Sequence, residues 1–193
     1  MLPGQVLDGE AVLRDAVLAK ASPRVMDAAR WASAGGTWRL LVPATLLVLS
    51  VSGPARHRWW LWGATLAAAP LIGEGWQEVV SRRRPSGSAL GFPSGHATSA
   101  AAFAVMVIYL VGRARLPPAA RLALQALAAL GMLAVGLARI LLGAHWPADV
   151  VAGFALGCAC AAAAAWWDAR HPHPRREDHG PEAERGGTVA PPR

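Results

Sequence analysis

Five long apolar stretches, separated by short segments rich in charges, Gly and Pro, constrain the fold of this chain more than any other feature of its sequence. They cover residues 38–52, 59–80, 96–112, 121–142 and 150–167. A helix needs about 17–25 predominantly apolar residues to cross a bilayer, and each stretch approaches or reaches that length. The sequence therefore predicts an all-α, polytopic membrane helix bundle of about five spanning helices.

The segments on either side of these stretches differ from them in composition. Residues 1–36 carry balanced charges, with apolar side chains at roughly helical spacing. This pattern predicts an amphipathic helical segment, either on the membrane surface or packed on the bundle. Residues 37–168 form the expected transmembrane bundle. Residues 169–193 are rich in Pro, Gly and charges, which is typical of a disordered tail.

The positive charge of the chain would indicate a nucleic-acid partner if the basic residues formed one patch. The chain has 19 Lys and Arg against 12 Asp and Glu, a net charge of +7, and every basic residue except Lys20 is an arginine. Many of them instead fall on one side of the expected membrane: Arg56, Arg58, Arg113, Arg115, Arg121, Arg170, Arg175 and Arg176. The positive-inside rule makes that side, and the tail, cytoplasmic. We therefore expect a bilayer and no nucleic acid as partner, and the sequence carries no signal for an oligomeric state.

A second group of polar residues falls on the opposite, extracytoplasmic side. One loop contains residues 82–85 (RRRP) and then 93–96 (PSGH), and the junction of the last two stretches contains Arg139, His145 and Asp149. Ionisable groups at the end of an apolar bundle are functional candidates. His145 and Asp149 are four residues apart, so at a helix start the carboxylate can orient the imidazole.

The types of residue in this group favour a phosphate site over a metal site. Ser94 is placed to cap a helix, and the N-terminus of that helix at Gly95 can bind an anion. Arg84 and Arg139 add planar donors that match phosphate oxygens, whereas several arginines would repel a zinc ion. We therefore expect neither a metal nor a cofactor.

The motifs resemble those of the type-2 phosphatidic acid phosphatases, a family that includes bacterial undecaprenyl pyrophosphate and phosphatidylglycerophosphate phosphatases. The PSGH motif is intact at residues 93–96. The SRxxxxxHxxxD motif keeps Arg139, His145 and Asp149 but has alanine in place of its serine. The KxxxxxxRP motif keeps Arg84 but has Gln77 in place of its lysine.

The resemblance implies a membrane lipid phosphatase, with residues 37–168 as its catalytic bundle. It implies that His145 is the nucleophile and forms a phosphohistidine, that Asp149 orients it, and that His96 acts as general acid and then base. The implied phosphate-binding residues are Arg84, Ser94, Gly95, Arg139 and Gln77, the last at the lysine position. We expect Arg82 or Arg83 to supply the missing cation, because both lie near Arg84 and an arginine side chain reaches far.

Two readings of the activity follow from the resemblance. The favoured substrate is undecaprenyl pyrophosphate, because a site on the extracytoplasmic face of the plasma membrane suits the recycling of a carrier lipid, and other lipid phosphates stay open. The loss of lysine at Gln77 leaves an alternative, a catalytically weakened phospholipid-binding membrane protein of the same fold. The intact His96, His145 and Asp149 argue against that alternative. An ion transporter is disfavoured, because the charges cluster at one end of the bundle.

Overall fold

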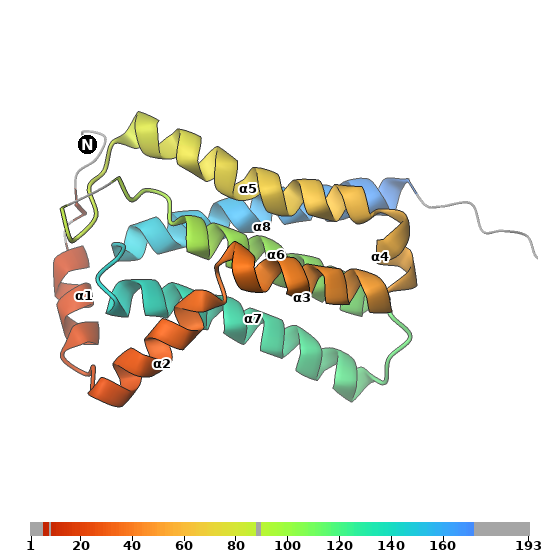
Figure 1. The fold of residues 1–193 in the computed structure, drawn as a ribbon, viewed down its shortest axis with the longest axis horizontal. Coiled ribbons are helices and arrows are strands. Elements are labelled where there is room, and N and C mark those ends of the chain that lie inside the picture. Colours follow the sequence, from red (N-terminus) through yellow and green to blue (C-terminus); the bar gives the residue numbers. More distant parts are fainter. Residues whose placement is uncertain (1–5, 8, 88–89, 172–193) are drawn as a thin grey trace, which may run out of the picture.

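The computed structural model describes residues 6–7, 9–87 and 90–171, and the part of the tail from residue 172 onward lies outside the described residues. The described residues form eight helices: α1 (Glu10–Leu18), α2 (Pro23–Ala34), α3 (Trp38–Val51), α4 (Gly53–His57), α5 (Trp59–Val80), α6 (Gly95–Arg113), α7 (Pro118–Leu141) and α8 (Pro147–Arg170). Five of them, α3 and α5 to α8, coincide with the five predicted apolar stretches and run lengthwise through the molecule (Figure 1). The all-α prediction is confirmed.

The number of membrane spans differs from the prediction. Three helices, α6, α7 and α8, are long and apolar enough to cross a membrane. α2 and α3 would form a fourth span if the pair, bent by 57° at its break, crossed as one unit. α5 has 22 residues but carries the exposed Glu74 and Glu78 near its end, and it is not among the apolar candidates. The predicted count of five is therefore not confirmed.

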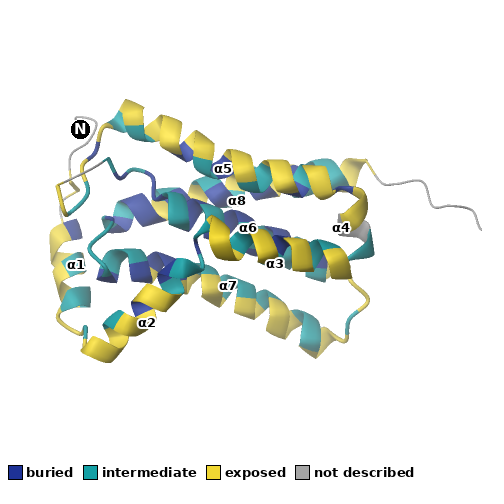
Figure 2. Ribbon diagram, viewed as in Figure 1, coloured by how far each residue is buried: buried dark blue, intermediate teal, exposed yellow. Residues whose placement is uncertain are grey.

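The central helix is α6, which packs most extensively on α8 and α7 and holds the largest share of the buried residues (Figure 2). Its close approach to α8 depends on small residues. A Cβ added to Gly157 would lie 2.2 Å from the carbonyl oxygen of Thr98, and one on Gly153 would lie 2.6 Å from that of Ser94. Small residues at four-residue spacing are typical of helix contacts in membranes. This contact fixes the N-terminal ends of α6 and α8 side by side.

A partly buried ion pair joins helices at the opposite end of the bundle. Arg58 pairs with Asp168 at 2.9 Å, and Asp168 also accepts a 2.6 Å hydrogen bond from Tyr109. The Arg58 guanidinium lies over the ring of Trp167. These contacts join α5, α6 and α8 at the end that carries the arginines predicted to face the cytoplasm.

The N-terminal helices pack on the bundle at the other end. α2 lies against α7, and α1 contacts both α7 and α8 (Figure 1). The turn after α2 is tight, because a Cβ on Gly36 would lie 2.8 Å from the Cβ of His96. Of the two placements that the sequence leaves open for this segment, its described part takes the packed one.

Candidate active site

The predicted site residues come together at the end of the bundle where α5 and α7 end and α6 and α8 begin. Each comes from a different piece of chain: Gln77 from α5, Arg84 from the following loop, His96 from α6, Arg139 from α7, and His145 from the α7–α8 turn. Arg84 and Arg139 lie within electrostatic range of both histidines. Residues that are far apart in sequence therefore form one cluster.

His145 is buried, with 1% of its surface exposed. Its Nδ1 lies 2.9 Å from the carbonyl oxygen of Gly91, but 3.6 Å from Oδ2 of Asp149. A carbonyl oxygen accepts and cannot donate, so Nδ1 carries the proton of the neutral ring and Nε2 keeps its lone pair. The backbone of Gly91, rather than the expected carboxylate, is the shorter contact that selects this tautomer.

Burial, together with the nearby arginines, favours the neutral form of the His145 imidazole. Burial lowers the pKa of His145 below its ordinary value, the carboxylate of Asp149 opposes that shift, and the positive charges of Arg139 and Arg84 lower the pKa further. A neutral ring with a lone pair on Nε2 is the form of histidine that can act as a nucleophile.

Asp149 is completely buried and makes two close contacts. Its Oδ1 accepts a 2.9 Å hydrogen bond from Nη1 of Arg82, and its Oδ2 accepts one of the same length from the backbone N–H of Trp146. The second bond satisfies a donor at the start of α8. Both contacts hold the carboxylate beside His145.

The guanidinium of Arg82 is engaged by carboxylates. It is 3% exposed, and its second terminal nitrogen pairs with Glu10 of α1. Two carboxylates hold its terminal nitrogens, so this arrangement does not favour Arg82 as the replacement for the motif lysine, and the expectation that Arg82 or Arg83 takes that role stays a prediction. Arg83 is exposed, and its carbonyl oxygen accepts a hydrogen bond from the indole of Trp146 at 3.1 Å. Its proposed phosphate contact stays a prediction.

Three buried donors around the site lack partners among the described residues: the hydroxyl of Ser94, Nε of Arg139 and Nε of Arg82. Ser94 stands at the N-cap position of α6 but forms no capping bond. Beside them, the position of a Cβ on Gly95 has no atom within 4 Å. Buried donors without partners are costly and call for an explanation. An anion bound at the start of α6 would accept a hydrogen bond from the Ser94 hydroxyl at its N-cap position.

Three further side-chain contacts brace this site. Arg84 donates from Nε to the carbonyl of Leu90 at 3.0 Å, and Arg139 donates from Nη1 to the hydroxyl of Ser33 at 2.9 Å. Gln77, at the lysine position, donates to the carbonyl of Pro93 at 3.1 Å. In the part of the chain that the structure describes, no three His, Cys, Asp or Glu are grouped to hold a metal ion.

The family model described as the PAP2 superfamily matches residues 71–172, more than half of the chain. The chain belongs to the PAP2 superfamily. The matched region contains both histidines, Asp149 and the arginines of the site. Glu10 and Ser33, which contact those arginines, lie outside it.

The chain is also similar to curated PAP2-type relatives. It is 37% identical over 126 residues to decaprenylphosphoryl-5-phosphoribose phosphatase of Mycobacterium tuberculosis, a match that covers 58% of this chain and 64% of that protein. The match to the protein of the same name from Mycolicibacterium smegmatis is 37% identical over 117 residues and covers 54% and 57% of the two chains. The chain thus spans less than two thirds of the length of these relatives.

Two crystal structures share the fold. A transmembrane PAP2-type phosphatidylglycerolphosphate phosphatase from Bacillus subtilis superposes with a TM-score of 0.74 at 22% identity, covering 85% of this chain and 86% of that one. LpxE of Aquifex aeolicus superposes with a TM-score of 0.68 at 16% identity, covering 85% and 98%. The chain therefore shares its helical arrangement with these two proteins.

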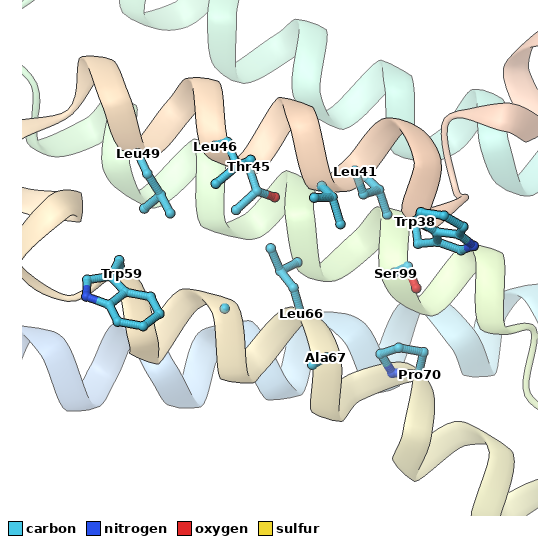
Figure 3. Close-up of a pocket in the computed structure, with 12 residues that line it drawn as sticks. Trp38, Leu41, Thr45, Leu46, Leu49, Trp59, Leu66, Ala67, Pro70 and Ser99 are labelled. Carbon is cyan, nitrogen blue, oxygen red and sulfur yellow. The ribbon is translucent and has the colours of Figure 1, made fainter.

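Two apolar cavities flank α3 beside this PAP2 site. One, of about 420 Å³, lies between α3 and α5 and extends from Trp59 at one end to Ser99 and Pro70 at the other (Figure 3). Pro70 marks a bend in α5, as expected for a proline inside a helix (Figure 3). The other cavity, of about 570 Å³, lies on the opposite side of α3, against α6 and α7. Both are lined mainly by apolar side chains.

Proposed function

We propose that this protein is a membrane lipid phosphatase that acts through a phosphohistidine on His145. The observation that carries the proposal is the hydrogen bond from Nδ1 of His145 to the Gly91 carbonyl, because it leaves Nε2 unprotonated inside an arginine-rich cluster. The two motif histidines, which are both present, and the PAP2 family support the same chemistry.

In the first step, Nε2 of His145 attacks the phosphorus atom of the substrate. The bond between phosphorus and the leaving oxygen breaks, and His96 donates a proton to that oxygen. The histidine ring becomes more positive as the new bond forms, and the buried carboxylate of Asp149, 3.6 Å from Nδ1, stabilises that charge.

In the second step, water hydrolyses the phosphohistidine. His96, now neutral, removes a proton from the water as its oxygen attacks phosphorus, and the bond from phosphorus to Nε2 breaks. Inorganic phosphate and the original histidine are the products. The phosphoryl oxygens are held by Arg84, Arg139, the Ser94 hydroxyl and the Gly95 amide, which act as donors to the charge of the transition state.

The substrate class that we propose is a polyprenyl lipid with a terminal phosphate. Decaprenylphosphoryl-5-phosphoribose is the first candidate, because the curated relatives at 37% identity are named for it. Undecaprenyl pyrophosphate, favoured by the outward orientation argued from the sequence, is the second. Both present a phosphate at the membrane surface while an isoprenoid chain stays in the bilayer.

We propose that the lipid chain lies in the cavity between α3 and α5. That cavity reaches Ser99, one turn along α6 from Gly95, and continues along the bundle. Ala67→Phe would fill it, and Ala128→Phe, in the cavity on the other side of α3, is the matched control. We expect Ala67→Phe to raise KM for a long-chain substrate and not for a short-chain one. If Ala128→Phe raised KM for the long-chain substrate and Ala67→Phe did not, the lipid chain would lie in the cavity against α6 and α7 instead.

We further propose that the site faces outward from the plasma membrane, with residues 37–168 as the catalytic bundle. Support comes from the distribution of charge, since Arg56, Arg113, Arg115 and Arg170 all lie near the end of the bundle opposite the site. By the positive-inside rule, that end is cytoplasmic.

The activity is tested by phosphate release from a panel of purified lipid phosphates in detergent. The panel contains the two polyprenyl candidates, phosphatidylglycerophosphate and phosphatidic acid. We expect turnover by the wild type and by Ser50→Ala, which changes an exposed hydroxyl, and none by His145→Ala. Radiolabelled phosphate should be trapped on the wild type as an acid-labile adduct and not on His145→Ala. Lipid binding without turnover by the wild type would instead support the binding-protein alternative suggested by Gln77.

A further inference from the structure

A buried chain of three charged side chains links the N-terminal helix to the site. Asp149 is 0% exposed, Arg82 is 3% exposed and Glu10 is 7% exposed. Arg82 donates to Asp149 at 2.9 Å through Nη1, and its Nη2 pairs with Oε2 of Glu10. The three residues come from α8, the loop after α5, and α1.

Glu10 is held in place by more than this ion pair. Its Oε1 accepts a 2.8 Å hydrogen bond from the backbone N–H of Ala148, and its Oε2 accepts one of 2.7 Å from that of Leu7. The first of these donors belongs to the opening turn of α8, where a carboxylate is favoured by the helix dipole. Figure 1 shows α1 lying across the end of the bundle at which α8 begins. Glu10 is thus a fixed part of that end.

We propose that Glu10 and Arg82 are positioning residues for the phosphoryl transfer at His145, acting through Asp149. The inference rests on the proposed function and assigns a role to α1, which lies outside the region matched by the family model. Arg82 alone would neutralise the charge of Asp149, whereas Glu10 returns the group to a net charge of −1. A net negative group behind His145 stabilises the positive charge that its ring gains during transfer.

The other charged groups near His145 make this balance important. They are Arg84 from the loop, Arg139 from α7 and His96 from α6, while Arg14 of α1 lies over the ring of Trp146. All are cationic or can become so. The negative charge that opposes them is supplied by Asp149 and, through Arg82, by Glu10.

The test compares Glu10→Gln with Glu10→Asp and with Asp15→Asn. Glutamine keeps the size of Glu10 and an oxygen for Ala148, and aspartate keeps the charge. Asp15 lies on the same helix with an exposed carboxylate that pairs only with Arg14 among the described residues, so it is the matched control.

Two measurements are made on each variant. One is the titration of His145, followed by the NMR signal of the ring that His145→Gln removes, and the other is kcat/KM against pH. We expect Glu10→Gln to lower the titration midpoint of His145 by roughly 0.5–1 unit. We expect kcat/KM to fall by about tenfold, with its acid limb moved to lower pH. Glu10→Asp should recover the midpoint, and Asp15→Asn should match the wild type.

The outcomes separate this inference from the proposed function. A wild-type midpoint in folded Glu10→Gln would overturn the positioning role, whatever the rate. Absence of turnover by the wild type on every lipid would overturn the proposed function, while the titration would still decide whether Glu10 controls the charge at His145.

Discussion

Removal of the Ser94 hydroxyl is expected to make the protein more stable and less active. The hydroxyl is completely buried and has no hydrogen-bond partner among the described residues. A buried polar group without a hydrogen-bond partner destabilises the folded state by about 1–3 kcal/mol. Removing one oxygen atom leaves a small void, which destabilises the folded state by only a few tenths of that amount. The backbone of Ser94 forms its hydrogen bonds without the hydroxyl. Its N–H donates to the Asp149 carbonyl, and its carbonyl accepts from Thr98. Ser94→Ala should therefore stabilise the unliganded protein by about 1–2 kcal/mol.

The same change should slow catalysis, because the hydroxyl is a donor to the phosphoryl group in the proposed mechanism. Loss of one such donor costs about 2.7–4 kcal/mol in the transition state, or a factor of 10²–10³ in kcat. The assay measures phosphate release together with thermal unfolding in detergent, with and without inorganic phosphate. Phosphate should raise the unfolding midpoint of the wild type more than that of Ser94→Ala.

Thr98→Val is the matched control for stability. Thr98 is equally buried, but its hydroxyl donates to the Ser94 carbonyl at 3.0 Å. Its removal should destabilise the protein by about 0.5–1.5 kcal/mol. If Ser94→Ala destabilised the protein as Thr98→Val does, the Ser94 hydroxyl would not be an unsatisfied donor. If Ser94→Ala left kcat unchanged, that hydroxyl would not bind the phosphoryl group.

Three other predictions concern the lysine position, the pH response and the helix contact. Gln77→Lys should raise kcat/KM by about tenfold in the phosphate-release assay, because a charged donor exceeds a neutral one by roughly 1.4 kcal/mol; an unchanged rate would show that the site lacks no cation. Burial lowers the pKa of His145 in the folded protein, so on acidification His145 is protonated in the unfolded state before it is protonated in the folded state. The free energy of unfolding should therefore decrease as pH falls below about 6.5. Unfolding of His145→Gln should lack this component of the pH dependence. Gly157→Ala should destabilise the bundle by about 1–3 kcal/mol, since its Cβ would lie 2.2 Å from a carbonyl oxygen, whereas Gly131→Ala, with nothing within 4 Å, should be neutral or stabilising in thermal unfolding.

The sequence predicted the helices well, because the apolar stretches and helix-start residues that mark them are local features. The apolar stretches predict the five lengthwise helices, and the last of these helices begins three residues before its predicted stretch, at Pro147, because proline fits a first helical turn. The span count was less certain because apolar length does not show how charges such as Glu74 and Glu78 near the end of α5 are accommodated.

The contacts that orient the site could not be read from the sequence. The acceptor of His145 is the backbone carbonyl of Gly91, and a backbone atom leaves no signature in residue type. Glu10 lies 72 residues from Arg82, in a helix whose other charges are exposed or partly exposed. Only the packing of α1 on the start of α8 makes that glutamate different from its neighbours.

The groups of the site differ in how firmly the fold holds them, and this difference follows from their supports. Ser94 and Asp149 lie at the start of the α6–α8 contact, where added Cβ atoms on Gly153 and Gly157 would clash and where the Ser94 N–H binds the Asp149 carbonyl. Arg139, by contrast, depends on a single hydroxyl from α2, outside the region shared with the family. The geometry of the nucleophile and its carboxylate is therefore set by the shared core of the fold. Arg84, in contrast, is held by the Leu90 carbonyl inside the shared region. Sequence changes in α2 can therefore adjust phosphate binding through Arg139 without displacing the nucleophile.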